Sequence, residues 1–308
     1  MTNSTASLRH RIESAGELQS VVRTMKAIAA SSIGQYEKSV RALADYYRAV
    51  ELGLSVCFRH GTQLALPVQG KPKAEVAVIG AIVFGSDQGL VGRFNELIVD
   101  HAMSVLRAVP GKRRLVWAVG ERVHSRLTDA GLTLAGLFAL PNSVQAITPL
   151  VGQILTVTER ELGKDEIAEI HLFYNRPTSG SGYEPVGQRL LPLDSAWGRE
   201  LAERPWPTHN VPEAMGDNTA TLRALIREFL FISLFRACAE SLASENASRL
   251  AAMQRAEKNI DESLETLRVA FYRVRQSSID EELFDVISGF EALSAGSDRV
   301  HAGGKAST

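Results

Sequence analysis

The chain has 308 residues, a formal net charge of −1, 45% hydrophobic and 22% charged residues, a composition typical of a soluble globular protein. The near-neutral charge gives no electrostatic basis for binding nucleic acid or a bare anionic membrane, and no run of about 18 apolar residues predicts a transmembrane helix. The two cysteines form no CxxC motif, which favours a reducing compartment, and residues 1–30 lack the apolar core of a signal peptide.

Both ends of the chain are free of proline, because all 11 prolines lie between Pro67 and Pro212. Proline inside a helix costs roughly 3 kcal/mol, so both ends can form long helices. Apolar or small residues recur there every three or four positions, from Leu8 to Leu54 and from Leu222 to Val274, with polar breaks at Asn246 and Glu257. Such a repeat is typical of a coiled-coil seam.

We therefore expect residues 1–60 and 213–293 to pair as one antiparallel coiled coil. A helix of about 70 residues spans about 105 Å, more than the diameter of a small domain. Part of the C-terminal helix must then be exposed or enclosed by other proteins. The alternative is a bundle broken by loops, but residues 217–288 contain neither proline nor glycine to break the helix.

The middle of the chain alternates strand-like and helical segments. Strands are predicted over 75–84, 113–120 and 166–175, and helices over 93–108, 121–130 and 143–162. We also predict a surface loop over 176–185 and an edge strand over 187–194. This order predicts a mostly parallel sheet covered by helices, a Rossmann-like α/β domain over 73–205 inserted between the two helices. Residues 294–308 are small and polar, and we expect a disordered tail there.

A glycine-rich turn, GSDQGLVGRFN over residues 85–95, follows the first predicted strand and precedes a predicted helix. Turns at this place often hold a phosphate. The spacing is GxxxGxxG, not GxGxxG, no GK[ST] follows, and KRRLVWAV offers no acidic ribose ligand. We expect a structural turn, with Gly85 and Gly89 closing it tightly and Gly92 allowing a helix close approach.

Other patterns that carry chemistry are absent from the sequence. The seven histidines are scattered, and neither HExxH, a Cys/His cluster nor GxSxG occurs. We predict no metal site, no cofactor and no catalytic residue. The acidic residues Asp280, Glu281, Glu282 and Asp285 are expected to form a solvated helix face.

Three stretches resemble the gamma subunit of rotary F-type ATP synthases. The turn is similar to the family's SDRGLCGGLN. The stretch RTMKAIAAS over 23–31 is similar to the family's KAMKMVAAS. The stretch RQSSIDEEL over 275–283 is similar to RQAxITxEL, and it lies within a segment over 241–293 that resembles the family's C-terminal helix. They follow the family's order. Departures at Ser32, Gly34, Gln35, Gln88, Val91 and Asp280 indicate a divergent branch, an alternative rotary ATPase whose coupling ion need not be the proton.

The resemblance implies a rotor shaft that makes no ATP itself. Its coiled coil lies inside a hexamer of alpha and beta subunits, and its inserted domain rests with the epsilon subunit on the c-ring, which makes the protein peripheral on the cytoplasmic face of the inner membrane. Arg275 and Gln276 match residues that contact a beta subunit. The residues matched to coupling between the helices are Arg23, Met25, Arg249, Gln276 and Glu282.

Two alternatives remain open on the residues alone. One is a stand-alone coiled-coil interaction protein without a motor, in which Arg275 is an exposed helix charge and Met25 only packs in the seam. The other is a Rossmann-like enzyme that uses the glycine turn for a nucleotide.

Overall fold

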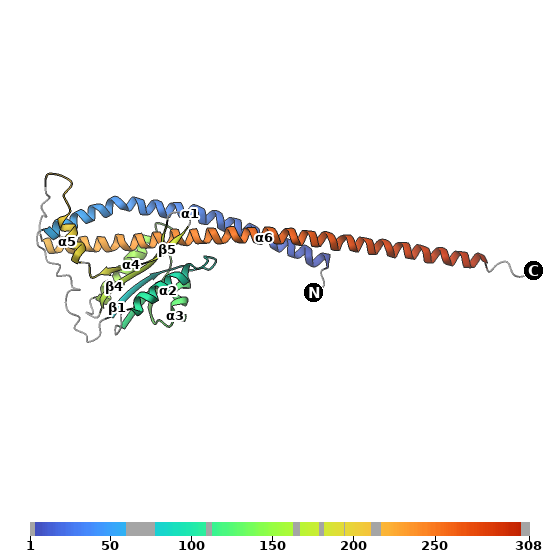
Figure 1. The fold of residues 1–308 in the computed structure, drawn as a ribbon, viewed down its shortest axis with the longest axis horizontal. Coiled ribbons are helices and arrows are strands. Elements are labelled where there is room, and N and C mark those ends of the chain that lie inside the picture. Colours follow the sequence, from blue (N-terminus) through green and yellow to red (C-terminus); the bar gives the residue numbers. More distant parts are fainter. Residues whose placement is uncertain are drawn as a thin grey trace, which may run out of the picture. The chain divides into compact units, whose positions relative to one another are not determined.

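The computed structural model describes residues 4–59, 78–108, 113–162, 167–178, 182–193, 195–210 and 217–302. Two long helices, α1 (Thr5–Arg59) and α6 (Asn218–Ala302), precede and follow an α/β region in the sequence. Both helices were predicted, and the absence of proline from them explains why they run unbroken. Figure 1 shows these elements in sequence colours.

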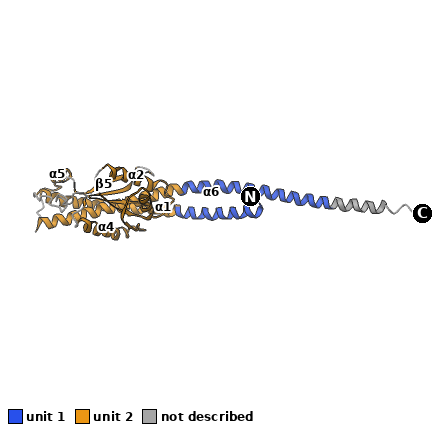
Figure 2. Ribbon diagram, turned by 90° about the horizontal axis from the view of Figure 1, so that it is seen from below, with its two compact units in different colours: residues 1–25, 253–308 blue, residues 26–252 orange. Residues whose placement is uncertain are grey.

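The chain divides into two compact units, coloured separately in Figure 2. The coil unit comprises residues 1–25 and 253–308, and the body unit comprises residues 26–252. This division differs from the predicted one, because the predicted boundary separated both whole terminal helices from the α/β domain. Each of the long helices contributes to both units.

In the coil unit, α1 and α6 pair in opposite directions. The Arg9 guanidinium lies 5.9 Å from the ring centre of Phe271, and Arg23 Nε lies 2.9 Å from an oxygen of Glu257. Between them, Gln19 donates a hydrogen bond to Asp261. Along these three contacts the residue numbers on α6 fall as those on α1 rise, which confirms the predicted antiparallel pairing in this unit.

The helices are also antiparallel in the body unit. Tyr46 donates a 2.7 Å hydrogen bond to Glu228, and a Cβ on Gly53 would lie 3.0 Å from Leu225. A short helix that the sequence did not indicate, α5 (Ser195–Glu203), closes this end. Its Leu201 is buried in a cluster with residues from α1 and α6.

A five-stranded sheet forms the rest of the body unit. Its strands are β1 (Val78–Phe84), β2 (Arg113–Val119), β3 (Leu134–Phe138), β4 (Ile167–Pro177) and β5 (Tyr183–Leu191). The order is β3-β2-β1-β4-β5, with every pair parallel except β4–β5. The predicted mostly parallel sheet is confirmed.

Two strands differ from the prediction. β5 is the expected edge strand, but it begins at Tyr183, inside the segment predicted as a surface loop. β3 was not predicted: its five residues include a glycine, and alternate positions are only half-buried, so its pattern is weak.

Helices cover both faces of the sheet. One face packs on α2 (Phe94–Arg107) and α3 (Glu121–Asp129), and the other on α4 (Ile147–Leu162) and on α6. Along β1, Val78 and Ile82 belong to the cluster with α6, whereas Ile79 and Val83 belong to the opposite cluster. Burial on both faces explains the unbroken apolar run of this strand.

The end of α6 also differs from the prediction. The helix continues to Ala302, so residues 294–302 are helical where a disordered tail was expected. Extending a helix that is already formed adds one hydrogen bond for each ordered residue and avoids the cost of nucleation. The predicted tail residues 303–308 and the predicted domain start over 73–77 lie outside the described residues.

The register of the coil unit can be tested by crosslinking. Cysteines introduced as Arg23→Cys and Glu257→Cys should be joined efficiently by a short bismaleimide, because the native side chains touch. The control pair Arg23→Cys and Arg273→Cys should not react, since 16 residues of helix separate positions 257 and 273, about 24 Å. Equal yields for both pairs, measured by mass spectrometry, would contradict this register.

Candidate functional site: the glycine turn and its contact with α6

The glycine turn, here residues 85–93, uses its own polar groups to hold its shape. Asn95 accepts a 3.0 Å hydrogen bond from the Ser86 N–H and donates one of 2.8 Å to the Ser86 hydroxyl. Asp87 accepts from the N–H of Glu121, the first residue of α3, at 2.9 Å. The Gly85 N–H donates to Val119. These donors are therefore not available to cradle a phosphate.

The start of α2 is also unsuited to an anion. Phe94 and Asn95 are buried there, and the Phe94 carbonyl accepts a 3.0 Å hydrogen bond from the Asn175 side chain. Glu96 lies in the first turn and pairs with Arg126 at 2.7 Å. A carboxylate at the helix N-terminus occupies the place where the helix dipole would otherwise favour a phosphate.

The glycines of the turn have different roles from those predicted. A Cβ on Gly85 would lie 2.2 Å from the Cβ of Val123, so Gly85 permits a close approach of α3 to the turn. Gly92 has φ 57° and supplies the left-handed turn, next to Leu90 with φ 61°. Gly89 has open space around it. The prediction assigned a tight turn to Gly85 and Gly89 and a close helix approach to Gly92; the close packing at Gly85 and the positive φ at Gly92 are features that it did not assign to those two residues.

Side chains of α6 donate hydrogen bonds to the glycine turn and to strand β4. The Ser248 hydroxyl donates to the Val91 carbonyl, and the Ser244 hydroxyl donates to the Asn175 carbonyl at 3.1 Å. Both serines are buried. Because the glycine turn joins β1 to α2, these bonds fasten α6 directly to the α/β region within the body unit.

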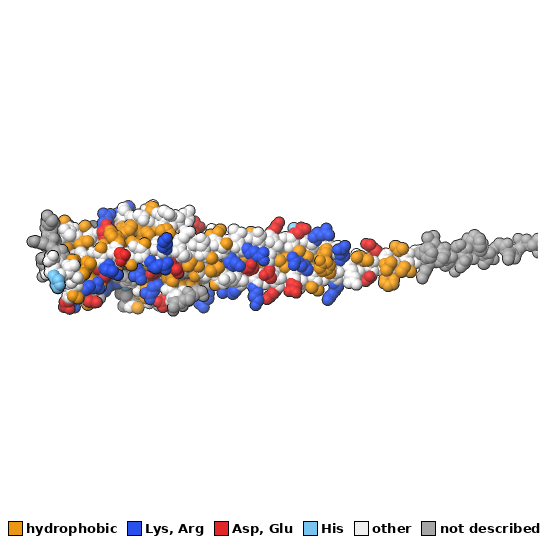
Figure 3. All heavy atoms as spheres, turned by 90° about the horizontal axis from the view of Figure 1, so that it is seen from above, with side chains coloured by type: hydrophobic (Ala, Val, Ile, Leu, Met, Phe, Trp, Pro, Cys, Tyr) orange, Lys and Arg blue, Asp and Glu red, His pale blue; other side chains and the backbone are white. Residues whose placement is uncertain are grey.

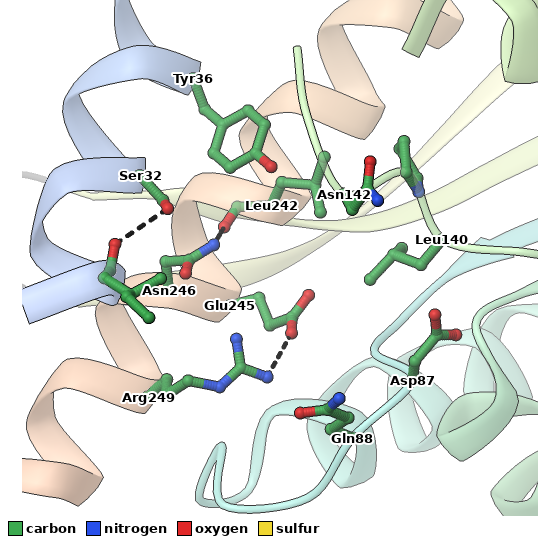
Figure 4. Close-up of a pocket in the computed structure, with 12 residues that line it drawn as sticks. Ser32, Tyr36, Asp87, Gln88, Leu140, Asn142, Leu242, Glu245, Asn246 and Arg249 are labelled. Carbon is green, nitrogen blue, oxygen red and sulfur yellow. Dashed lines mark hydrogen bonds and ion pairs between the residues drawn. The ribbon is translucent and has the colours of Figure 1, made fainter. Parts of the chain in front are cut away.

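Beside these bonds lies an open cavity of about 330 Å³. Four segments line it: α1, the glycine turn, the loop before α4 and α6. In Figure 4, Asp87 and Gln88 face Glu245 and Arg249 across it. The sequence prediction placed Arg249 and the glycine turn in separate roles, and the fold brings them to one site.

An ion pair between Glu245 and Arg249 forms the α6 side of this cavity. The two side chains are only 4% and 14% exposed, and their charged atoms lie 2.6 Å apart. Burial raises the pKa of the Glu245 carboxyl; the Arg249 charge opposes this rise, and the Asp87 charge adds to it. Within the described residues, Glu245 Oε2 and Arg249 Nε have no hydrogen-bond partner.

The residues predicted to couple the two helices do not form one cluster. Arg23 is 57% exposed and pairs with Glu257, and Met25 is half-buried. Gln276 and Glu282 are exposed on α6. They follow Phe271, which already faces Arg9 near the start of α1, so they lie past the described partner helix.

Arg275 is exposed as well, and so is the acidic run from Asp280 to Asp285. Both Arg275 and Gln276 are exposed to solvent, so their side chains are accessible to a partner. Their proposed contact with a beta subunit stays a prediction.

Sequence reasoning missed Ser248, which joins α6 to the turn, and it missed Asp87 and Glu245, which line the cavity between them. One signal was present. Asn246 interrupts the apolar seam, and it is buried with its amide donating to Leu242 at 2.8 Å. A polar break in a seam marks a place where the helix faces something other than an apolar partner.

Known proteins match this chain over nearly its whole length. The profile of a family described as ATP synthase matches residues 4–293. The ATP synthase gamma chain of Nostoc punctiforme is 28% identical over 93% of this chain and 98% of its own length, and that of Clostridium acetobutylicum is 27% identical over 93% and 97%.

The chain belongs to the ATP synthase gamma-chain family. A solved Euglena gracilis mitochondrial ATP synthase (OSCP/F1/c-ring) contains a chain of the same fold, with TM-score 0.63, 17% identity and 95% coverage of both chains. The rotor of that organism's enzyme gives TM-score 0.59, 15% identity and coverage of 89% and 98%. The family that the three motifs predicted is therefore confirmed.

Among the described residues, no three His, Cys, Asp or Glu side chains are grouped so as to hold a metal ion. None of the described helices is long and apolar enough to cross a membrane.

The turn's packing role predicts a contrast between two glycines. Gly85→Ala should destabilise the chain by about 1–3 kcal/mol, because the added methyl overlaps Val123. Gly89→Ala should change the free energy of unfolding by no more than about 0.5 kcal/mol, since its Cβ enters open space. Urea unfolding measures both, and equal effects would contradict the assigned roles.

The occupied Gly85 and Ser86 N–H groups and the sequence of the turn predict a second result. The isolated chain should bind no ATP with micromolar affinity and hydrolyse none, because neither a phosphate cradle nor a lysine and magnesium ligand is present in the turn. Isothermal titration calorimetry tests this directly. Micromolar ATP binding that is lost on Gly85→Ala would revive the nucleotide hypothesis.

Proposed function

We propose that this chain is the central rotor shaft of a membrane ATP synthase or ATPase. It couples ion flow through a c-ring to ATP synthesis or hydrolysis in a hexamer of alpha and beta subunits. The chain itself contributes no catalytic site. It acts peripherally on the cytoplasmic face of the inner membrane through the complex, with the epsilon subunit beside its α/β region.

One observation carries the proposal: α6 exposes an apolar stripe that begins beside the first residues of α1 and continues past the point where α1 begins. The stripe is spaced by seven, four and four residues on one helix face, at Tyr272, Ile279, Leu283 and Ile287, and these side chains are between 45% and 64% exposed. Figure 3 shows hydrophobic side chains gathered on this described end of α6.

We expect another protein to bury this stripe. Burying a leucine or isoleucine side chain stabilises by about 1.5–3 kcal/mol, and a solvated helix rarely exposes several in one row. A sleeve formed by the hexamer would bury it. The alternative of a stand-alone coiled-coil protein leaves the stripe uncovered and does not account for the family match over residues 4–293.

The shaft would act through its asymmetry. The faces of a two-helix coil differ in charge and shape, so three beta subunits around it meet different surfaces at any moment. Their nucleotide sites then differ in affinity, and rotation exchanges those states. In thermodynamic terms, rotor angle and nucleotide affinity are linked by a coupling free energy.

We assign the contact with a beta subunit to Arg275 and Gln276, which precede most of the apolar stripe. A guanidinium can bind a carboxylate with two hydrogen bonds, and an amide can both donate and accept. Arg23 and Met25 on α1, and Arg249, Gln276 and Glu282 on α6, are proposed to influence coupling efficiency. For Arg249, the support is its buried pair with Glu245 beside the glycine turn.

Replacing Arg275 and Gln276 together by alanine tests this assignment. The helix should stay folded, because alanine has the highest helix propensity and both side chains are exposed. Each lost contact to a charged partner costs about 1.5–3 kcal/mol if it is buried at the interface. The assembled enzyme should keep its subunit composition and lose ATPase turnover or ion pumping.

The matched control replaces Glu281 and Asp285 by alanine on the same exposed helix segment, where we expect a smaller effect. Wild-type turnover and pumping in the Arg275→Ala, Gln276→Ala variant would show that this contact does not exist here. ATP hydrolysis with lost pumping would support a coupling role for these residues.

A further inference from the structure

The cavity between the glycine turn and α6 has the features of a small binding site. We propose that it binds the ammonium group of a small alkylamine, with Glu245 as the main acceptor. It lies wholly within the body unit and is separate from the apolar stripe and from Arg275.

The first argument is charge. The titratable residues that line the cavity are Asp87, Glu245 and Arg249, besides Tyr36. Burial and the Asp87 charge raise the pKa of the Glu245 carboxyl, and a bound cation beside it would favour its ionised form. With both carboxylates ionised, two negative charges and one positive charge leave a formal charge of −1. A bound monocation would neutralise it, whereas an anion would meet two carboxylates.

The second argument is an unused acceptor. Glu245 is 97% buried, since only 3% of its surface is exposed, and its Oε1 accepts from Arg249. Its Oε2 is buried without a partner among the described residues. In Figure 4 the carboxylate points from α6 into the cavity, toward Leu140 and Asp87. An ammonium group can donate to this oxygen and still has two N–H groups for other acceptors.

The third argument is the rest of the lining. Asn142 and Asn246 offer amide oxygens, and the Asn246 amide nitrogen is already used by Leu242. Apolar groups of Ile28, Leu140 and Leu242 provide surface for a short alkyl chain. A volume of about 330 Å³ is at the lower end for ligand pockets and suits a small molecule or a single side chain.

Other ligand classes fit less well. A divalent metal ion would need more anionic ligands, and the described residues contain no group of three that could hold one. A nucleotide phosphate meets the same two carboxylates and a turn whose Gly85 and Ser86 N–H groups already donate to Val119 and Asn95. A primary ammonium on an alkyl chain satisfies both the charge and the apolar lining.

Occupancy would tie two parts of the body unit together. The ammonium would lie between Glu245 on α6 and Asp87 on the glycine turn, which line the same cavity. Since such a ligand binds only the folded chain, it should raise the melting temperature as its concentration rises.

The test is a titration of the full chain with n-butylammonium chloride, with n-butanol as the neutral isostere. Binding is followed by saturation-transfer NMR and by shifts of the Asn142 and Asn246 side-chain amide signals. We expect butylammonium to bind at least tenfold more tightly than butanol. Glu245→Gln should weaken butylammonium binding at least tenfold, because a neutral amide replaces the main anionic acceptor.

Two further variants keep the result interpretable. Asp87→Asn can still accept the hydrogen bond from Glu121, so it should fold, and it should weaken binding several-fold. Glu281→Gln removes an exposed carboxylate outside the cavity and should not change the affinity. Equal binding of butanol and butylammonium, wild-type affinity in the Asp87→Asn variant, or no binding at tens of millimolar would overturn the proposal.

The ammonium could come from a free amine or from a lysine of a neighbouring subunit. If a lysine fills the cavity in the assembled enzyme, butylammonium will bind the isolated chain but not the complex. If the natural source is a free amine, it will bind both. Either result supports the site and identifies the source.

Discussion

The close packing of α6 between α1 and the sheet is the contact on which the body unit depends. Part of α6 packs with small residues: Ala237, Ala239 and Ala243 are buried in one cluster with strand residues from β1 and β4, beside larger side chains such as Leu234 and Leu242. Small side chains let the helix backbone approach the sheet closely. That approach brings the Ser244 and Ser248 hydroxyls within hydrogen-bonding distance of backbone carbonyls of the α/β region.

The glycine turn is best understood through this contact. Its sequence resembles a phosphate-binding turn, because both need glycine between a strand and a helix. Here the freedom of glycine serves packing: Gly85 makes room for Val123 of α3, and the turn presents the Val91 carbonyl to α6. The same backbone geometry that elsewhere aims N–H groups at an anion is used to fasten a helix.

The buried ion pair of Glu245 and Arg249 is not a strong source of stability, because removing two charges from water offsets much of their attraction. Its position is more informative than its energy. The pair lies where α6 leaves the sheet and where Asp87 adds a second carboxylate, so the cavity combines polar groups that no single element contains. Of these residues, only Arg249 was singled out from the sequence, and that was through the family resemblance.

The sequence by itself determined the class of this protein. Proline-free ends with a seam from Leu8 to Leu54 specify long helices, because helix periodicity and the absence of breakers act locally. The unbroken apolar run of β1 similarly indicates a strand buried on both faces, and three motifs were enough to identify the family.

Only the tertiary structure decided which of these elements meet. The roles of Gly85 and Gly92 depend on whether Val123 lies against the turn, and neither φ nor a neighbour 38 positions away can be read from GxxxGxxG. β3 and α5 are short and weakly patterned, so their existence depends on packing partners. The site that joins Asp87 to Glu245 depends on the antiparallel return of a helix more than 150 residues later, and such long-range contacts leave no local pattern in the sequence.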